Sequence, residues 1–154
     1  MVLKKELAIN GGHPVIKNEF PAYNTIGKEE INAANKVLES GKLSGFLGSR
    51  GEGFHGGEQV RSLEKEVAEY FGIKHCIAVN SWTSGLVAII GAIDIEPGDE
   101  IIVTPWTMVA TATSILQWNA IPVFVDIDET TFNIDPKKIE ASITDKTKAI
   151  LYAD

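Results

Sequence analysis

Apolar residues recur at helical spacing in the first part of the chain. Ile31, Ala34 and Leu38 share one face of a helix predicted over residues 28–39, and Ser40-Gly41 supplies its stop. A second predicted helix ends at Gly72 and carries an apolar stripe that we expect to be buried. The stripe consists of Val60, Leu63, Val67, Tyr70 and Phe71.

Beyond Gly72, short apolar runs alternate with helical segments. The runs, each predicted to be a buried strand, are residues 76–79, 101–103, 123–125 and 149–152. Helices are predicted over residues 83–93 and 107–118, and a further helix from Asp135-Pro136 with Ile139 and Ile143 on its apolar face. This order predicts the α/β class, with a mostly parallel sheet, helices on both faces, and ligands beyond the carboxyl ends of the strands.

The two predicted helices are joined by a stretch of high glycine density over residues 44–57. We therefore expect residues 1–57 to form an N-terminal arm, a first helix and a glycine-rich loop, and residues 58–154 to form a partial domain. Because Asp154 stands where a strand would pass into its loop, we expect this domain to be truncated at its C-terminus.

Charge and composition exclude several classes of protein. The net charge of -7 argues against a nucleic-acid binder, which needs clustered Lys and Arg. No apolar run is long enough to span a membrane, and the opening Met1 to Leu7 shows no secretory signal, so we expect a cytoplasmic protein. With Cys76 as the single cysteine there is no internal disulfide, and the three histidines lack metal-ligand spacing.

Two motifs are weak candidates for ligand binding. Residues 51–56 match G-x-G-x-x-G, but no apolar strand precedes them, so a flexible loop that could cover an active site is the better interpretation. Residues 80–85, Asn-Ser-Trp-Thr-Ser-Gly, follow the first strand and open a helix. Free backbone N–H groups there can bind a phosphate, although simple capping by Ser81 or Thr83 explains the residues equally well. After the next strand, an aromatic or polarizable side chain in residues 104–108 could stack on a planar cofactor or fill the core.

Taken in order, several segments resemble the DegT/DnrJ/EryC1/StrS aminotransferases, a family of sugar aminotransferases. The matching segments cover nearly the whole chain, and it is their order that is specific. They are residues 7–12, 26–31, 40–45, 71–81, 83–84, 97–105, 109–112 and 122–128.

The resemblance implies an enzyme of fold type I that uses pyridoxal 5'-phosphate (PLP) and works as a homodimer, with active sites at the subunit interface. Thr83 and Ser84 match the pair that binds the PLP phosphate, and Trp82 replaces the usual glycine before them. Met108, or alternatively Trp106, matches the residue that stacks on the pyridine ring, and Ser44 and Gly45 match a substrate loop.

The resemblance also implies that the catalytic residues are not in this chain. The aspartate that pairs with the pyridine nitrogen and the Schiff-base lysine lie farther along in the family. Lys42, Lys74 and Lys148 do not match that lysine, so we expect them to lie on the surface. We also expect residues 1–154 by themselves to be unable to catalyse transamination.

The whole protein is expected to transfer an amino group, with glutamate as donor, to the keto group of a sugar that is usually nucleotide-linked. Two alternatives remain open: a PLP-dependent sugar dehydratase of the same family, and a non-catalytic sugar-binding or regulatory module. A nucleotide-dependent oxidoreductase would rest only on the glycine pattern.

Overall fold

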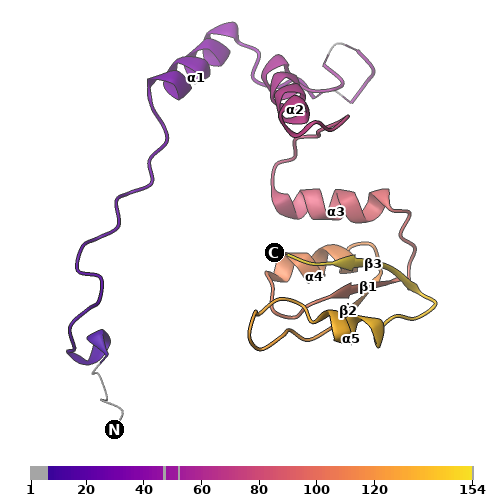
Figure 1. The fold of residues 1–154 in the computed structure, drawn as a ribbon. Helices are drawn as coiled ribbons and strands as arrows, with labels where there is room; N and C mark the ends of the chain where they lie inside the picture. The colour runs from indigo at the N-terminus through magenta and orange to yellow at the C-terminus, as the bar shows by residue number, and fades with distance from the viewer. Residues whose placement is uncertain (1–6, 47, 52, 154) are drawn as a thin grey trace. The chain divides into compact units, whose positions relative to one another are not determined.

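The computed structural model describes residues 7–46, 48–51 and 53–153 (Figure 1). Met1 to Glu6, Leu47, Glu52 and Asp154 lie outside the described residues. They include most of the N-terminal segment in which no secretory signal was found and two positions of the glycine-rich loop. The chain forms two compact units, Met1–Arg61 and Ser62–Asp154. The domain boundary expected between residues 57 and 58 stays a prediction.

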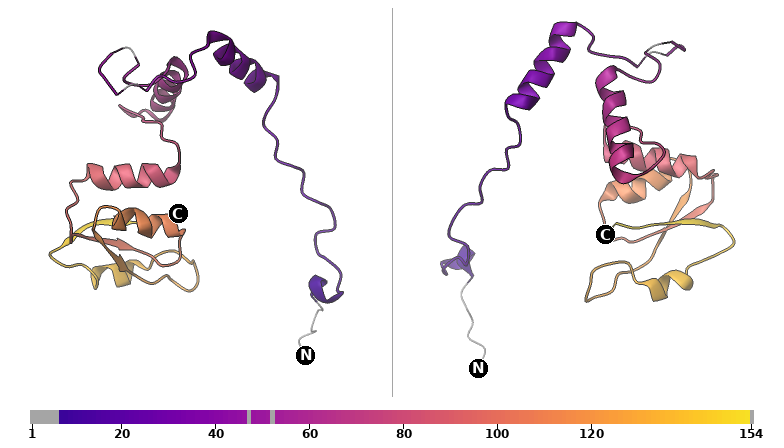
Figure 2. Two further views of the ribbon diagram at one scale, coloured as in Figure 1. Left: turned by 180° about the vertical axis from the view of Figure 1, so that it is seen from behind. Right: turned by 45° about the horizontal axis from the view of Figure 1, so that its top comes forward.

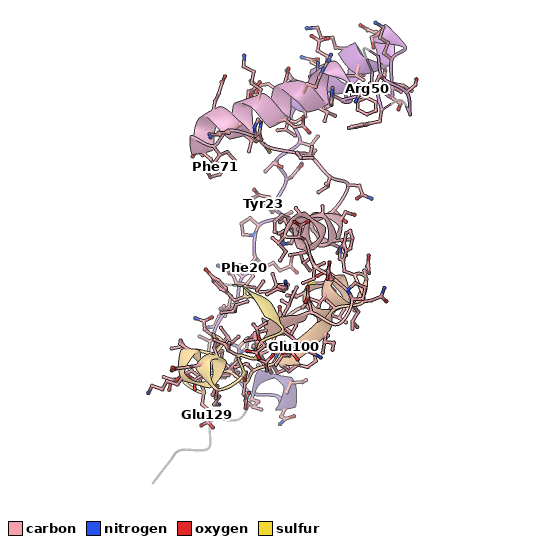
Figure 3. The ribbon with its side chains drawn as sticks, turned by 90° about the vertical axis from the view of Figure 1, so that its right-hand side faces the viewer. Phe20, Tyr23, Arg50, Phe71, Glu100 and Glu129 are labelled. Carbon is pink, nitrogen blue, oxygen red and sulfur yellow. The ribbon has the colours of Figure 1, made fainter. Side chains whose placement is uncertain are left out.

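The first unit contains a short 3-10 helix, η1 (Ala8–Asn10), and the helix α1 (Lys28–Ser40), which confirms the first predicted helix. The Gly27 N–H donates to the Glu30 carboxylate at 2.7 Å, and Gly41 ends the helix with a positive φ of 68°. The segment between η1 and α1 has no helix or strand, and its aromatic side chains Phe20 and Tyr23 are 79% and 94% exposed (Figure 3).

The helix α2 (Glu58–Phe71) is confirmed, and Gly72 ends it with a φ of 65°. The expected burial of its apolar stripe is wrong, because α2 has no buried residue and Tyr70 is 84% exposed. An apolar stripe predicts that one face of a helix can pack against another element, but the spacing does not show whether such an element is present. Among the described residues, a hydrogen bond of 2.8 Å from the Ala78 N–H to the Glu64 carboxylate is the long-range polar contact of α2.

The second unit is built on a parallel sheet of three strands in the order β2-β1-β3, which confirms the expected α/β class. Ile102 in the central strand is opposite Val123 on one side and Ile150 on the other. The helices and strands of this unit are α3 (Trp82–Ala92), β1 (Glu100–Val103), α4 (Val109–Leu116), β2 (Ile121–Phe124), α5 (Pro136–Glu140) and β3 (Thr147–Leu151).

Helices lie on both faces of this sheet, as expected. The helices α3 and α4 lie on one face and the short α5 on the other (Figures 1 and 2). The core lies between the first pair and the sheet, and Ala149 and Leu151 of β3 pack against it. Its buried residues are Ile90, Ile95, Ile101, Val103, Ile115 and Ala120.

Three sequence-based expectations for this unit are corrected. Residues 76–79 form no strand, and Ile77 is 78% exposed, because no described strand lies beside them to share hydrogen bonds. The helix expected over residues 107–118 is shorter, since α4 begins after Met108 and ends before Gln117. Ile143 lies beyond α5 and is 55% exposed, because the chain leaves the helix at Ala141 and enters a turn.

One edge of the sheet gathers the segments with candidate chemistry. The strands end, and α3 begins, on the same side of the unit (Figure 1). Parallel sheets bind their ligands beyond this carboxyl edge because loops and helix N-termini meet there.

Candidate functional site

Ser81 organises the start of α3. Its backbone is extended, and its hydroxyl oxygen accepts a hydrogen bond of 3.2 Å from the Ser84 N–H. The Ser81 carbonyl accepts from the Gly85 N–H at 3.1 Å, and the hydroxyls of Ser81 and Ser84 are 3.2 Å apart. The cap that the sequence allows is therefore formed, and it uses Ser81 rather than Thr83.

Capping leaves other donors at this helix start without a partner. The N–H groups of Trp82 and Thr83 have no acceptor within the part of the chain that the structure describes. Thr83 is exposed, Ser84 is half-buried, and the first turn of α3 contains no acidic residue. Unpaired amides and the positive end of the helix dipole favour an anion at this position.

A hollow of about 250 Å³ lies beside these hydroxyl groups. It is lined by Thr83, Ser84, Val87, Ala88 and Gln117, so it follows the flank of α3 toward the end of α4. The unpaired amides belong to the first turn, at one end of this hollow. The two hydroxyl side chains therefore border a concave surface.

The loop between β1 and α4 holds the two candidates for stacking on a cofactor ring. Thr104 is buried at the end of β1, and its hydroxyl oxygen accepts from the Trp106 N–H at 3.2 Å. The side chains of Trp106 and Met108 are 66% and 73% exposed, so both are free to contact a ligand. The structure does not choose between them, and their role stays a prediction.

Sequence reasoning missed one aromatic residue at this edge. Phe132 follows β2, and its ring centroid lies 6.0 Å from that of Trp106. In the sequence, Phe132 is recognisable only as an aromatic residue in a polar loop after a strand. Many surface loops share this feature, so it does not indicate a ligand site.

Ser44 and Gly45 belong to the first unit, and the structure leaves their expected contact with substrate untested. A Cβ on Gly45 would lie 2.4 Å from the Gly57 backbone nitrogen, so the ends of the glycine-rich loop touch. No strand precedes the glycines of residues 51–56 among the described residues, which agrees with the interpretation as a loop.

The remaining ionisable groups form no second site in the described parts of the chain. There, no group of three or more His, Cys, Asp and Glu side chains could hold a metal ion. Lys42, Lys74 and Lys148 are exposed, and Lys148 lies 3.9 Å from the Asp99 carboxylate. None of the described helices is long and apolar enough to cross a membrane.

Residues 24–154 match the model of the DegT/DnrJ/EryC1/StrS aminotransferase family. The chain belongs to this family. Its members depend on PLP, and the match includes most of the ordered segments that carry the resemblance in the sequence.

Two curated relatives match most of this chain, and the name of the second states an aminotransferase reaction. The chain is 45% identical over 137 residues to the spore coat polysaccharide biosynthesis protein SpsC of Bacillus subtilis, a match that covers 88% of this chain and 32% of SpsC. It is 34% identical to the L-glutamine:2-deoxy-scyllo-inosose aminotransferase of Streptomyces lividus, covering 97% of this chain and 34% of that enzyme. The chain thus spans about a third of the length of these relatives.

Solved structures of the family show the same fold. An aminotransferase from Psychrobacter cryohalolentis aligns with a TM-score of 0.74 at 36% identity, over 87% of this chain and 32% of its own. The PLP form of a sugar aminotransferase from Streptococcus pneumoniae aligns at 0.70 and 32% identity, over 81% and 29%. An E. coli GDP-4-keto-6-deoxy-D-mannose-3-dehydratase with bound hydrated PLP aligns at 0.71 and 32% identity, over 85% and 32%. The chain has part of a PLP-dependent domain of fold type I.

The start of α3 fits the phosphate of such a cofactor. It offers two unpaired N–H groups and the hydroxyls of Thr83 and Ser84, all neutral donors, with no carboxylate in the same turn to repel an anion.

Proposed function

We propose that the whole protein is a PLP-dependent aminotransferase that transfers an amino group to the keto group of a sugar or a related cyclic polyhydroxy ketone. The observation that supports this most directly is the start of α3, where unpaired amides and hydroxyls lie together at the carboxyl edge of a parallel sheet. The family and the relatives supply the class of reaction.

Each residue of the site has a distinct part in this proposal. The Thr83 and Ser84 hydroxyls and the Trp82 and Thr83 N–H groups bind the phosphate and anchor the cofactor. Met108 stacks on the ring of the cofactor, with Trp106 as the alternative. When bound, PLP supplies an electron sink for the carbon that exchanges the amino group. We propose that the lysine that carries PLP lies outside residues 1–154 of the whole protein, because Lys42, Lys74 and Lys148 do not match the position of that lysine in the family.

The substrates and the assembly are finer parts of the same proposal. Glutamate is the amino donor that we expect, and L-glutamine, named in the inosose relatives, is the direct competitor. The acceptor is a keto sugar, nucleotide-linked in our expectation. The active form is a homodimer in the cytoplasm, and Ser44 and Gly45 contact the substrate.

The test of the phosphate site uses the whole protein with Thr83 and Ser84 both changed to Ala. Each charge-assisted hydrogen bond contributes about 1.5–3 kcal/mol, and about 1.4 kcal/mol corresponds to tenfold in affinity. We expect PLP affinity, measured by absorbance titration of the apoenzyme, to fall roughly a hundredfold or more. The control is Ser62→Ala, an exposed serine of α2. PLP affinity equal in both variants would contradict the proposed site.

A dehydratase is the second candidate, because a PLP-containing dehydratase is among the structures that this chain resembles. The two activities differ in their products. An aminotransferase consumes one amino donor for each amino sugar formed, whereas a dehydratase removes water from the sugar and leaves no nitrogen on it. The reaction is run separately with ¹⁵N-labelled glutamate and with glutamine labelled at its amide or at its amine nitrogen, and the sugar product is analysed by mass spectrometry. A product that contains ¹⁵N indicates an aminotransferase, and a product without nitrogen indicates a dehydratase.

A further inference from the structure

Trp106 and Phe132 form an aromatic pair, to which the proposed function assigns only the alternative role of Trp106 in stacking on the cofactor. Their ring centroids are 6.0 Å apart with an interplanar angle of 35°, within the range of favourable aromatic contacts. Trp106 follows the end of β1, and Phe132 lies in the loop that follows the neighbouring strand β2. Two separate loops thus bring aromatic rings together at the carboxyl edge.

This pair is not part of the core. Trp106 is 66% exposed and Phe132 is 56% exposed, although aromatic side chains of this size dominate core packing when they are buried. Trp106 lies in the same loop as Met108, two residues after the buried Thr104. It therefore presents apolar ring surface to solvent at the edge where a ligand is expected.

The backbone around Phe132 holds the ring in this place. Phe132 has a φ of 62°, a strained conformation that is uncommon for a bulky L-residue. The loop imposes it, because the Phe132 N–H donates to the Asp128 carbonyl at 2.9 Å and the Asp128 N–H donates to the Asn133 carbonyl at 2.9 Å. Ile127 and Ile134 close the loop with an antiparallel bridge.

Lys138 of α5 fastens both ends of this loop. Its ammonium group lies 3.8 Å from the Asp126 carboxylate and 4.0 Å from that of Asp135, and it donates to the Ile127 carbonyl at 3.4 Å. The loop is thus tied to α5 at its base and closed across its middle, which restricts the position of the Phe132 ring.

We propose that Trp106 and Phe132 form an aromatic wall that binds the apolar face of the cyclic keto substrate, with Phe132 positioning Trp106. This inference rests on the proposed function and adds the contact that recognises the acceptor. The C–H groups on one face of a sugar or cyclitol ring carry partial positive charge and pack against the negative face of an aromatic ring. Met108 remains for the cofactor, so the two neighbouring side chains have separate ligands.

The experiment compares the whole protein, loaded with PLP, with its Phe132→Leu, Phe132→Tyr and Glu129→Ala variants. Leucine keeps an apolar side chain and removes the ring, tyrosine restores a ring, and Glu129 is an exposed residue of the same loop. We measure KM and kcat for 2-deoxy-scyllo-inosose and for a GDP-linked 4-keto sugar. Binding of both to the protein is also measured by saturation-transfer NMR of their ring protons.

Phe132→Leu is expected to raise the KM of the accepted ketone about tenfold with a smaller change in kcat, and to weaken saturation transfer to the ring protons on one face. Phe132→Tyr and Glu129→Ala are expected to remain within about twofold of the unmodified protein. PLP affinity, and the absorbance change that the amino donor produces without any ketone, are expected to stay the same in all variants.

Three results would overturn the wall. One is an unchanged KM in Phe132→Leu, and another is a loss of PLP affinity in that variant equal to its loss of ketone binding, which would assign Trp106 to the cofactor. The third is an absence of saturation transfer from the unmodified protein to either ketone. Failure of the proposed function would be seen in a different measurement. In that case, PLP affinity would stay normal after Thr83 and Ser84 are both replaced.

Discussion

Gly91 shows at a single residue how the position of α3 is fixed. A Cβ on Gly91 would lie 2.2 Å from the ring of Trp118, and the Trp118 indole N–H donates to the Val87 carbonyl at 2.8 Å. The absence of a side chain at Gly91 thus allows an aromatic ring from the end of α4 to lie directly on α3. The position of α3 matters for the proposed function, because its first turn carries the Thr83 and Ser84 hydroxyls that we propose bind the phosphate.

Gly91→Ala is expected to destabilise the protein despite the better helix propensity of alanine. The gain from propensity is about 1 kcal/mol or less, whereas forcing a methyl group into a filled space costs about 1–3 kcal/mol. Displacement of Trp118 would also break its hydrogen bond to Val87. The free energy of unfolding from urea titration checks this. The control is Gly48→Ala, because no described atom beyond its two chain neighbours lies within 4 Å of the added Cβ. A variant more stable than the unmodified protein would contradict it.

At the scale of elements, the loop between β2 and α5 is stabilised by one carboxylate. Asp128 accepts from the N–H groups of Thr131 and Thr130, each at 2.9 Å. These bonds, first from Thr131 and then from Thr130, lower the pKa of Asp128 below its ordinary value of 3.8, with a smaller contribution from the charge of Lys137.

The loop is expected to loosen in acid. Because the pKa of Asp128 is lower in the folded state, its stabilising contribution is present above pH 3.8 and is lost as the pH falls through the depressed value. NMR titration of the Asp128 carboxyl carbon gives its pKa, and the Phe132 amide signal reports the loosening of the loop. Asp128→Ala removes the titrating carboxylate, and Glu129→Ala is the control. A midpoint above 3.8 for the Asp128 carboxyl group would show that the loop does not use the ionised form.

The elements of the second unit were largely predictable, because local signals determine them. Residues 101–103 are continuously apolar and form the buried β1, and Asp135-Pro136 begins a helix in which the Asp135 carboxylate accepts from the Lys137 N–H at 2.9 Å. The serine at the start of α3 also acts as a cap, as its residue type indicates.

The errors arise where a partner from elsewhere in the chain decides the outcome. Residues 76–79 have the composition of a buried strand, yet composition does not provide the neighbouring strand with which they would pair. The Phe132 ring was missed because its position depends on a positive φ imposed by Asp128 and Asn133, and periodicity contains no such information. The proximity of Trp106 and Phe132 is likewise a property of the sheet order, which places their strands side by side.

At the scale of the whole molecule, the described residues expose many large apolar side chains. They occur on α2, in residues 76–79, and on both edge strands, where Phe124 of β2 is 55% exposed and Ile150 of β3 is 44% exposed. Parallel sheets are covered on both faces in stable proteins, and an open apolar edge strand pairs readily with other chains.

The polypeptide of residues 1–154 expressed alone is therefore expected to self-associate. Ile77, 78% exposed, is a sensitive position for the test, because it lies in an apolar segment without a partner strand among the described residues. Ile77→Lys adds a charge that opposes pairing, so this variant is expected to sediment as a smaller species than the unmodified polypeptide at the same concentration. His75→Lys adds the same charge at an exposed polar position and is the control.

The same pair of substitutions in the whole protein gives the opposite expectation. If the rest of the protein covers residues 76–79, Ile77→Lys buries a charge and lowers the free energy of unfolding by several kcal/mol, whereas His75→Lys changes it by about 0.5 kcal/mol or less. Sedimentation velocity measures the self-association of the polypeptide, and urea unfolding measures the stability of the whole protein. A polypeptide that stays monomeric at tens of micromolar, together with a whole protein that tolerates Ile77→Lys, would show that this apolar segment has no partner in either form.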